Sequence, residues 1–125
     1  MSAARRFEDL EVWAVAFRLV QEIYQLSDSP TFARDFALRD QIRRASTSAM
    51  SNVAEGFGRR STIEFIRFLD IARSSATEVQ SLLYVARSQH YVSNEQFRAS
   101  YEMCQTLRFK IGAFMRYLRK HKESN

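Results

Sequence analysis

Apolar residues recur at helical spacing in four stretches, near residues 8–26, 34–56, 62–89 and 94–121. Within each stretch they fall three or four positions apart, which places them on one side of an α-helix. At 1.5 Å per residue such helices are about 28 to 42 Å long, matched enough to pack side by side. We therefore predict an all-α fold, an antiparallel up-down four-helix bundle, with residues 1–125 forming a single domain.

The interruptions between these stretches are short. Residues 27–31 contain a proline, and residues 55–61 contain two glycines followed by Ser61, which has Glu64 three positions later. Residues 89–93 end on Ser93, which has Gln96 three positions later. A serine followed by Glu or Gln at that spacing predicts a capping box at the start of a helix. Because the connections are short, consecutive helices should run antiparallel.

The stretch 8–26 is apolar on two sides instead of one. One stripe contains Leu10, Trp13, Phe17, Val20 and Tyr24. The other contains Val12, Val15, Ala16, Leu19, Ile23 and Leu26. Together they span an arc of about 220°, well beyond the 100° or so that a surface helix needs. Either this helix is tucked unusually deep between its neighbours, or one stripe forms a subunit interface; we favour the interface and expect a homo-oligomer.

Composition narrows the class of protein. Hydrophobic residues make up 46% of the 125 residues, and three glycines and one proline are too few for an all-β domain. No apolar run is long enough to span a membrane, and no signal-peptide core follows the N-terminus, so we expect a cytoplasmic protein with no membrane partner. The single cysteine, Cys104, lies among apolar residues, as expected for a buried side chain in a reducing compartment.

The net charge of +5 is concentrated in the last third of the chain, where residues 87–125 carry eight basic and three acidic residues. Several of these basic residues lie within one arc of the helix 94–121, outside its apolar stripe. An aromatic residue lies inside the same arc, where a core residue is not expected. The members of this set are Arg98, Arg108, Phe109, Arg116, Arg119 and Lys120. Basic side chains neutralise phosphates and an aromatic ring can stack on an unpaired base, so this arc favours RNA or single-stranded DNA binding. The competing interpretation is a solvated basic face with Phe109 buried in a subunit contact.

The helix 34–56 carries an unusual polar string beside its apolar stripe. The polar positions that share a face are Gln41, Arg44, Ser48, Ser51, Asn52 and Glu55. Buried polar atoms need hydrogen-bonding partners, which Arg43 or Arg44 and Glu55 could provide. We therefore interpret the string as a polar seam that fixes helix register within the bundle or ring. A serine here lacks the activating base of a nucleophile.

This string resembles the motif of the bacterial four-helix bundle family known as 23S rRNA intervening-sequence proteins. The residues that carry the resemblance are Gln41 to Ala45, Ser48, Ser51 to Gly56, and Arg59. Those we assign to a structural seam or interface are Arg43, Arg44, Ser48, Asn52, Glu55, Gly56 and Arg59. Looser matches extend the resemblance over residues 7–118. The chain departs from the family at Ala33, where proline is frequent, and at Ser74, where glycine is frequent.

The resemblance implies an up-down bundle that assembles into a ring, commonly a homopentamer. A related branch serves as the accessory protein of diversity-generating retroelements, where the basic ring contacts a reverse transcriptase and nucleic acid. For this chain the resemblance therefore implies self-assembly and, as a partner, nucleic acid or a protein such as a reverse transcriptase.

Signals of catalysis are missing from the sequence. His90 and His121 are far apart, no His, Cys or carboxylate cluster has metal-ligand spacing, and Gly56 and Gly58 lack the rest of a phosphate-binding loop. We expect no enzyme activity, no metal and no cofactor. The favoured hypothesis is a homo-oligomeric adaptor that binds RNA through the basic arc. The alternative is an oligomeric scaffold that docks a nucleic-acid-handling protein without contacting RNA.

Overall fold

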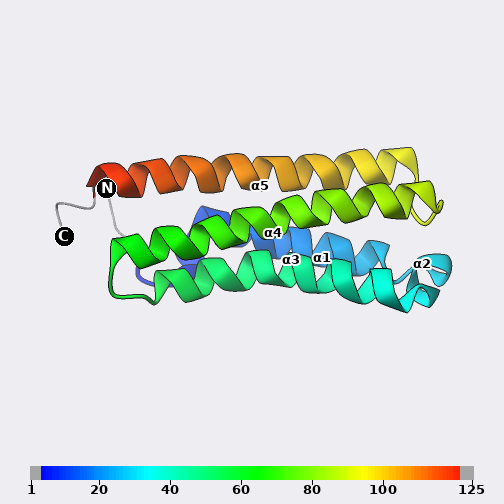
Figure 1. The fold of residues 1–125 in the computed structure, drawn as a ribbon, viewed down its shortest axis with the longest axis horizontal. Coiled ribbons are helices and arrows are strands. Elements are labelled where there is room, and N and C mark those ends of the chain that lie inside the picture. The colour runs from blue at the N-terminus through cyan, green and yellow to red at the C-terminus, as the bar shows by residue number, and fades with distance from the viewer. Residues whose placement is uncertain (1–3, 122–125) are drawn as a thin grey trace.

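The structure, a computed structural model, describes residues 4–121, which form helices and no strand (Figure 1). The elements are a 3₁₀ turn η1 (Phe7–Asp9) and the helices α1 (Glu11–Leu26), α2 (Pro30–Arg34), α3 (Phe36–Phe57), α4 (Thr62–Ser88) and α5 (Asn94–His121). The predicted all-α class is therefore confirmed for the described part of the chain. Residues 1–3 and 122–125 of the predicted domain lie outside it.

The long helices α1, α3, α4 and α5 lie side by side, and each runs opposite to the long helix before it (Figure 1). The main contacts join α3 to α4, α4 to α5, α1 to α3 and α1 to α5. Each long helix therefore packs mainly against two others, and the core lies between the four. No helix within residues 4–121 is both long and apolar enough to cross a membrane.

The predicted apolar stripes of the last three long helices form this core. α3 contributes Leu38, Ile42, Ala45, Ala49 and Val53, which are all buried. α4 contributes Leu69, Ala72, Ala76, Val79, Leu83 and Ala86. α5 contributes Phe97, Cys104, Leu107, Ile111 and Met115. The expectation of a buried cysteine is thus confirmed.

The helix ends follow local capping chemistry. The Oγ of Ser61 accepts a hydrogen bond from the Glu64 amide at 3.1 Å, and the Ser93 Oγ accepts one from the Gln96 amide at 3.0 Å. The Gln96 side chain returns a bond by accepting from the Ser93 amide at 2.8 Å, which completes the predicted capping box there. At the other end of α4, His90 has φ 63°, and the Tyr91 amide donates to the Ala86 carbonyl. This is a Schellman turn, and here a histidine occupies the position that usually holds glycine.

Two boundaries differ from the prediction. α1 begins at Glu11, because the preceding residues form η1 and the Asp9 carboxylate accepts from the Arg5 and Arg6 amides, each at 3.2 Å. Pro30 starts a separate short helix, α2, where its missing N–H costs nothing at the first helical position. α3 then starts afresh, with Asp35 accepting from the Leu38 amide at 3.1 Å.

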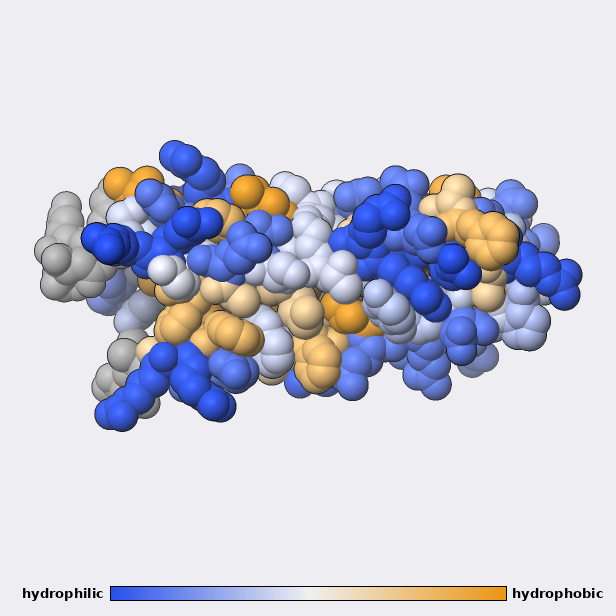
Figure 2. Space-filling model, turned by 90° about the horizontal axis from the view of Figure 1, so that it is seen from below, coloured by the Kyte–Doolittle hydropathy of each residue, from blue (hydrophilic) through white to orange (hydrophobic). Residues whose placement is uncertain are grey.

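α1 is fully covered on only one of its two apolar sides. The stripe from Val12 to Leu26 is buried. On the other stripe Leu10 is buried and Trp13 and Val20 are half-buried, whereas Phe17 and Tyr24 remain 42% and 43% exposed. Figure 2 shows the molecule from below, relative to Figure 1. Apolar surface lies among hydrophilic side chains on this face. Within one chain, therefore, the second stripe of α1 has no complete cover.

Candidate nucleic-acid interface

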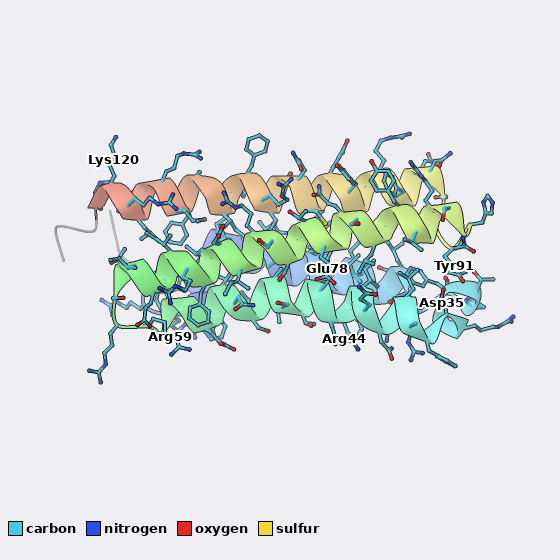
Figure 3. All side chains as sticks on the ribbon, viewed as in Figure 1. Asp35, Arg44, Arg59, Glu78, Tyr91 and Lys120 are labelled. Carbon is cyan, nitrogen blue, oxygen red and sulfur yellow. The ribbon has the colours of Figure 1, made fainter. Side chains whose placement is uncertain are left out.

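The basic arc predicted from the sequence lies on α5. Arg98, Arg116, Arg119 and Lys120 are exposed, and Lys120 lies in the last turn of α5 (Figure 3). Arg119 and Lys120 occupy the last turn of α5, where positive charge also interacts favourably with the helix dipole. The C-terminal end of α5 is therefore strongly basic.

Phe109 is the most exposed large apolar side chain of the described residues, at 70%. Its ring makes no contact with another aromatic ring or with a guanidinium within residues 4–121. It lies seven residues before Arg116, which at 3.6 residues per turn places the two on one line along α5. The ring is thus exposed to solvent on the same side of α5 as a cation that lies two turns, or about 10 Å along the axis, further on, and an exposed ring can stack on an unpaired base.

Arg73 of α4 joins this surface, although the sequence analysis did not include it. A Cβ built on Gly112 of α5 would lie 3.4 Å from Nη1 of Arg73 and 3.7 Å from Nη1 of Arg116. The glycine thus leaves room for two guanidinium groups from different helices. Arg73 also forms an ion pair with Asp70 of the same helix at 2.7 Å, so an acidic side chain borders this surface. A glycine in the interior of a helix was the only sequence signal for this contact.

Two predicted members of the arc lie in different surroundings. Nη1 of Arg108 donates to Oε1 of Gln105 at 3.0 Å and to Oε1 of Gln80 at 3.4 Å. Arg108 is half-buried, and its guanidinium is therefore held at the contact between α4 and α5. Arg98 is exposed but lies within about one turn of Glu95 and Glu102. Their negative charges partly neutralise its positive charge.

The continuous basic surface is therefore shorter than predicted from the sequence, and we call it the basic patch. Its members are Arg73, Phe109, Arg116, Arg119 and Lys120. Lys110, although next to Phe109 in sequence, lies on another side of α5, where it faces α1 and forms an ion pair with Glu11 at 2.8 Å. From Phe109 to Lys120 the patch extends about 17 Å along α5.

The polar string of α3 meets α4. The hydroxyls of Ser48 and Ser75 lie 2.9 Å apart, and Nδ2 of Asn52 donates to the carbonyl and hydroxyl oxygens of Ser48 at 2.8 and 3.0 Å. About two turns nearer the start of α3, Nε2 of Gln41 donates to Oε2 of Glu78 at 3.3 Å. Two of these contacts, Ser48 to Ser75 and Gln41 to Glu78, join α3 to α4. The interpretation of the string as a seam that fixes helix register stays a prediction.

The charged residues of the same string have other surroundings. Nε of Arg43 donates to Oγ of Ser27 at 2.8 Å, and its guanidinium lies 4.4 Å from the Tyr24 ring centroid. Arg43 therefore serves the contact between α3 and the end of α1, and not the seam. Arg44 and Glu55 are exposed, and Arg59 lies over the Phe68 ring at 4.6 Å (Figure 3). Gly56 is buried against α4.

The described residues contain no group of three or more His, Cys, Asp or Glu side chains that could hold a metal ion. Burial raises the pKa of the Cys104 thiol to about 12, and the nearby positive charge of Arg108 offsets this only in part. At neutral pH Cys104 is therefore a protonated thiol without nucleophilic character.

Comparison with known proteins agrees with this architecture. A protein of unknown function from the S23 ribosomal protein family of Bacteroides thetaiotaomicron, known from its crystal structure, superposes with a TM-score of 0.77. It is 21% identical, and the match covers 83% of this chain and 97% of that one. No curated protein matches the chain. The model of the 23S rRNA-intervening sequence protein family matches residues 8–113, and the chain therefore belongs to that family.

Proposed function

We propose that the chain is a non-catalytic adaptor that binds RNA through the basic patch. The observation that carries this proposal is the exposed Phe109 ring on the same side of α5 as Arg116, with Arg73 of α4 close to Arg116 at Gly112. A single-stranded nucleic acid offers phosphates to the guanidinium groups and unpaired bases to the ring. The names of the family and of the structural neighbour both refer to ribosomal components, so RNA is the nucleic acid to test first.

The working unit that we propose is a homo-oligomeric ring of antiparallel four-helix bundles, a homopentamer by the family resemblance. The uncovered stripe of α1 supports this. Phe7, Trp13 and Phe17 form a continuous row of rings, with centroid separations of 5.2 and 5.3 Å. Aromatic rows of this kind are typical of protein interfaces. A ring would repeat the basic patch in every subunit, and binding several patches at once would raise the affinity of a long RNA.

The second candidate function is an oligomeric scaffold that docks a nucleic-acid-handling protein, such as a reverse transcriptase, without contacting RNA. The charge of the basic patch favours this as well, because an acidic surface of a partner protein would pair with the same cations as phosphates do. The two functions differ in what the basic patch contacts, an RNA strand or an acidic protein surface.

The test is an RNA titration of the purified protein at low salt, with fluorescence anisotropy of a labelled single-stranded oligonucleotide. Charge reversal of two patch residues, Arg116→Glu with Arg119→Glu, should abolish binding because it replaces attraction to phosphates by repulsion. The matched control, Arg34→Glu with Arg67→Glu, changes the same net charge on exposed positions of α2 and α4. Loss of binding in the patch variant alone supports the proposal. An absence of binding by the unaltered protein at low salt would leave the scaffold function.

A further inference from the structure

The turn between α4 and α5 contains an open pocket of about 700 Å³, distant from the basic patch. α4 lines it with Tyr84, Val85 and Arg87, and the turn and the start of α5 add His90 and Asn94. The volume lies within the range of pockets that take small organic ligands, and it is larger than a simple anion needs. The lining includes a cation and no acidic residue, so the pocket favours a ligand with negative charge.

Arg87 supplies the cation in a fixed position. Its guanidinium carbon lies 4.0 Å from the Phe97 ring centroid and 5.2 Å from the Tyr84 ring centroid. Such stacking holds the planar group while leaving its N–H edges free. No hydrogen bond or ion pair within residues 4–121 uses those donors. A held guanidinium with unused donors matches the paired oxygens of a phosphate.

Tyr84 and Val85 add an apolar surface next to this cation. They remain 50% and 44% exposed, which is more than their neighbours on α4 that face the core. The Tyr84 ring is fixed by edge contacts with Phe97 and Tyr101, with centroids 4.9 and 5.9 Å away. The pocket thus offers a rigid aromatic surface and a phosphate-binding group side by side.

We propose that this pocket binds a nucleotide, with its phosphate on Arg87 and its base against Tyr84 and Val85. The shared chemistry is a phosphate joined to a planar base, which a free nucleotide and the 5′ end of a strand both supply. The pocket lies at the opposite end of α5 from the basic patch, and the inference does not depend on RNA binding there.

The experiment is isothermal titration of the full chain with AMP, adenosine and inorganic phosphate. AMP should bind at least tenfold more tightly than adenosine or phosphate, because only AMP uses both parts of the pocket. Arg87→Gln should weaken AMP binding at least tenfold, whereas Arg67→Gln, a matched change on the exposed side of α4, should leave it unchanged. Tyr84→Ala should weaken the binding of AMP and not that of phosphate.

Arg87→Gln could weaken binding simply by disturbing the fold, so a second variant separates loss of binding from loss of folding. Asn94→Asp places a negative charge in the lining at the first turn of α5, where it also favours the helix, so the fold is kept while phosphate is repelled. It too should weaken AMP binding at least tenfold. A 5′-phosphorylated dinucleotide that binds more tightly than AMP would assign the pocket to a strand end, and the reverse order would assign it to a free nucleotide. Equal affinity for AMP and adenosine, or full affinity in both variants, would overturn the proposal.

Discussion

Gly56 of α3 lies directly against Phe68 of α4. A Cβ built on this glycine would come within 2.7 Å of the Cβ of Phe68 and 2.9 Å of a Phe65 ring carbon. The Cβ of Phe68 is fixed by the α4 backbone and cannot turn away. The two helices can approach this closely near their connection only because residue 56 has no side chain.

Gly56→Ala should therefore destabilise the protein. Alanine favours a helix over glycine by about 1 kcal/mol, but overpacking in a rigid contact costs roughly 1 to 3 kcal/mol, and the clash should dominate. Urea unfolding measures the difference. Gly58→Ala is the control, because its Cβ would meet only the Glu55 carbonyl at 3.6 Å, so this variant should be neutral or slightly stabilised. A more stable Gly56→Ala variant would contradict the packing described here.

Ser48 and Ser75 should be energetically coupled. Removing either hydroxyl leaves the other without its 2.9 Å partner, at a cost of about 1 kcal/mol. The double variant Ser48→Ala with Ser75→Ala removes both, so its destabilisation should be smaller than the sum of the single ones. A double-mutant cycle by urea unfolding checks this. Strict additivity would show that the two hydroxyls do not interact.

The stability of the protein should fall above pH 9 through Cys104. Burial raises the pKa of this thiol from its ordinary value of 9.0 to about 12, so the unfolded chain loses the proton at lower pH than the folded chain does. Stability that is fully present below pH 9 is therefore lost as pH rises, by up to about 1.4 kcal/mol per pH unit. Unfolding by urea at pH 8, 9 and 10 measures the slope. The Cys104→Ala variant should lose less stability over this range, and an identical slope would contradict the assignment.

The helices and their core faces could be predicted from the sequence because each stripe follows the period of an α-helix. α2 could not be predicted, because Pro30 marks an interruption equally well when it starts a short helix. The hydrogen bond from Arg43 to Ser27 could not be predicted either, because the two residues become neighbours only when α1 and α3 pack together.

The candidate site shows the same limit. The exposed Phe109 could be identified from the sequence, because an aromatic residue outside the apolar stripe breaks the helical pattern. Arg73 belongs to another helix, and its approach to Arg116 depends on the packing of α4 against α5 at Gly112. The half-buried position of Arg108 likewise depends on Gln80, which a helix period alone does not reveal.

The uncovered stripe of α1 predicts that self-association depends on Phe17. Phe17→Glu places a charge beside the Trp13 ring and should shift the protein toward monomer, because burying an unpaired charge is unfavourable. Light scattering after size-exclusion chromatography measures this at micromolar concentration. Ile63→Glu is the control, since Ile63 is 59% exposed on α4 and outside this stripe. A wild-type monomer would refute the proposed ring.

The most direct test of the RNA-binding role is the dependence of affinity on salt. Each phosphate contact with a single strand contributes about 0.7 to the slope of log affinity against log salt concentration. Arg116→Gln with Arg119→Gln should therefore reduce the slope by about 1.4, whereas Phe109→Ala should lower affinity by about 1 to 3 kcal/mol and leave the slope unchanged. That separation is the predicted result. An unchanged slope in the arginine variant would contradict RNA binding through the basic patch.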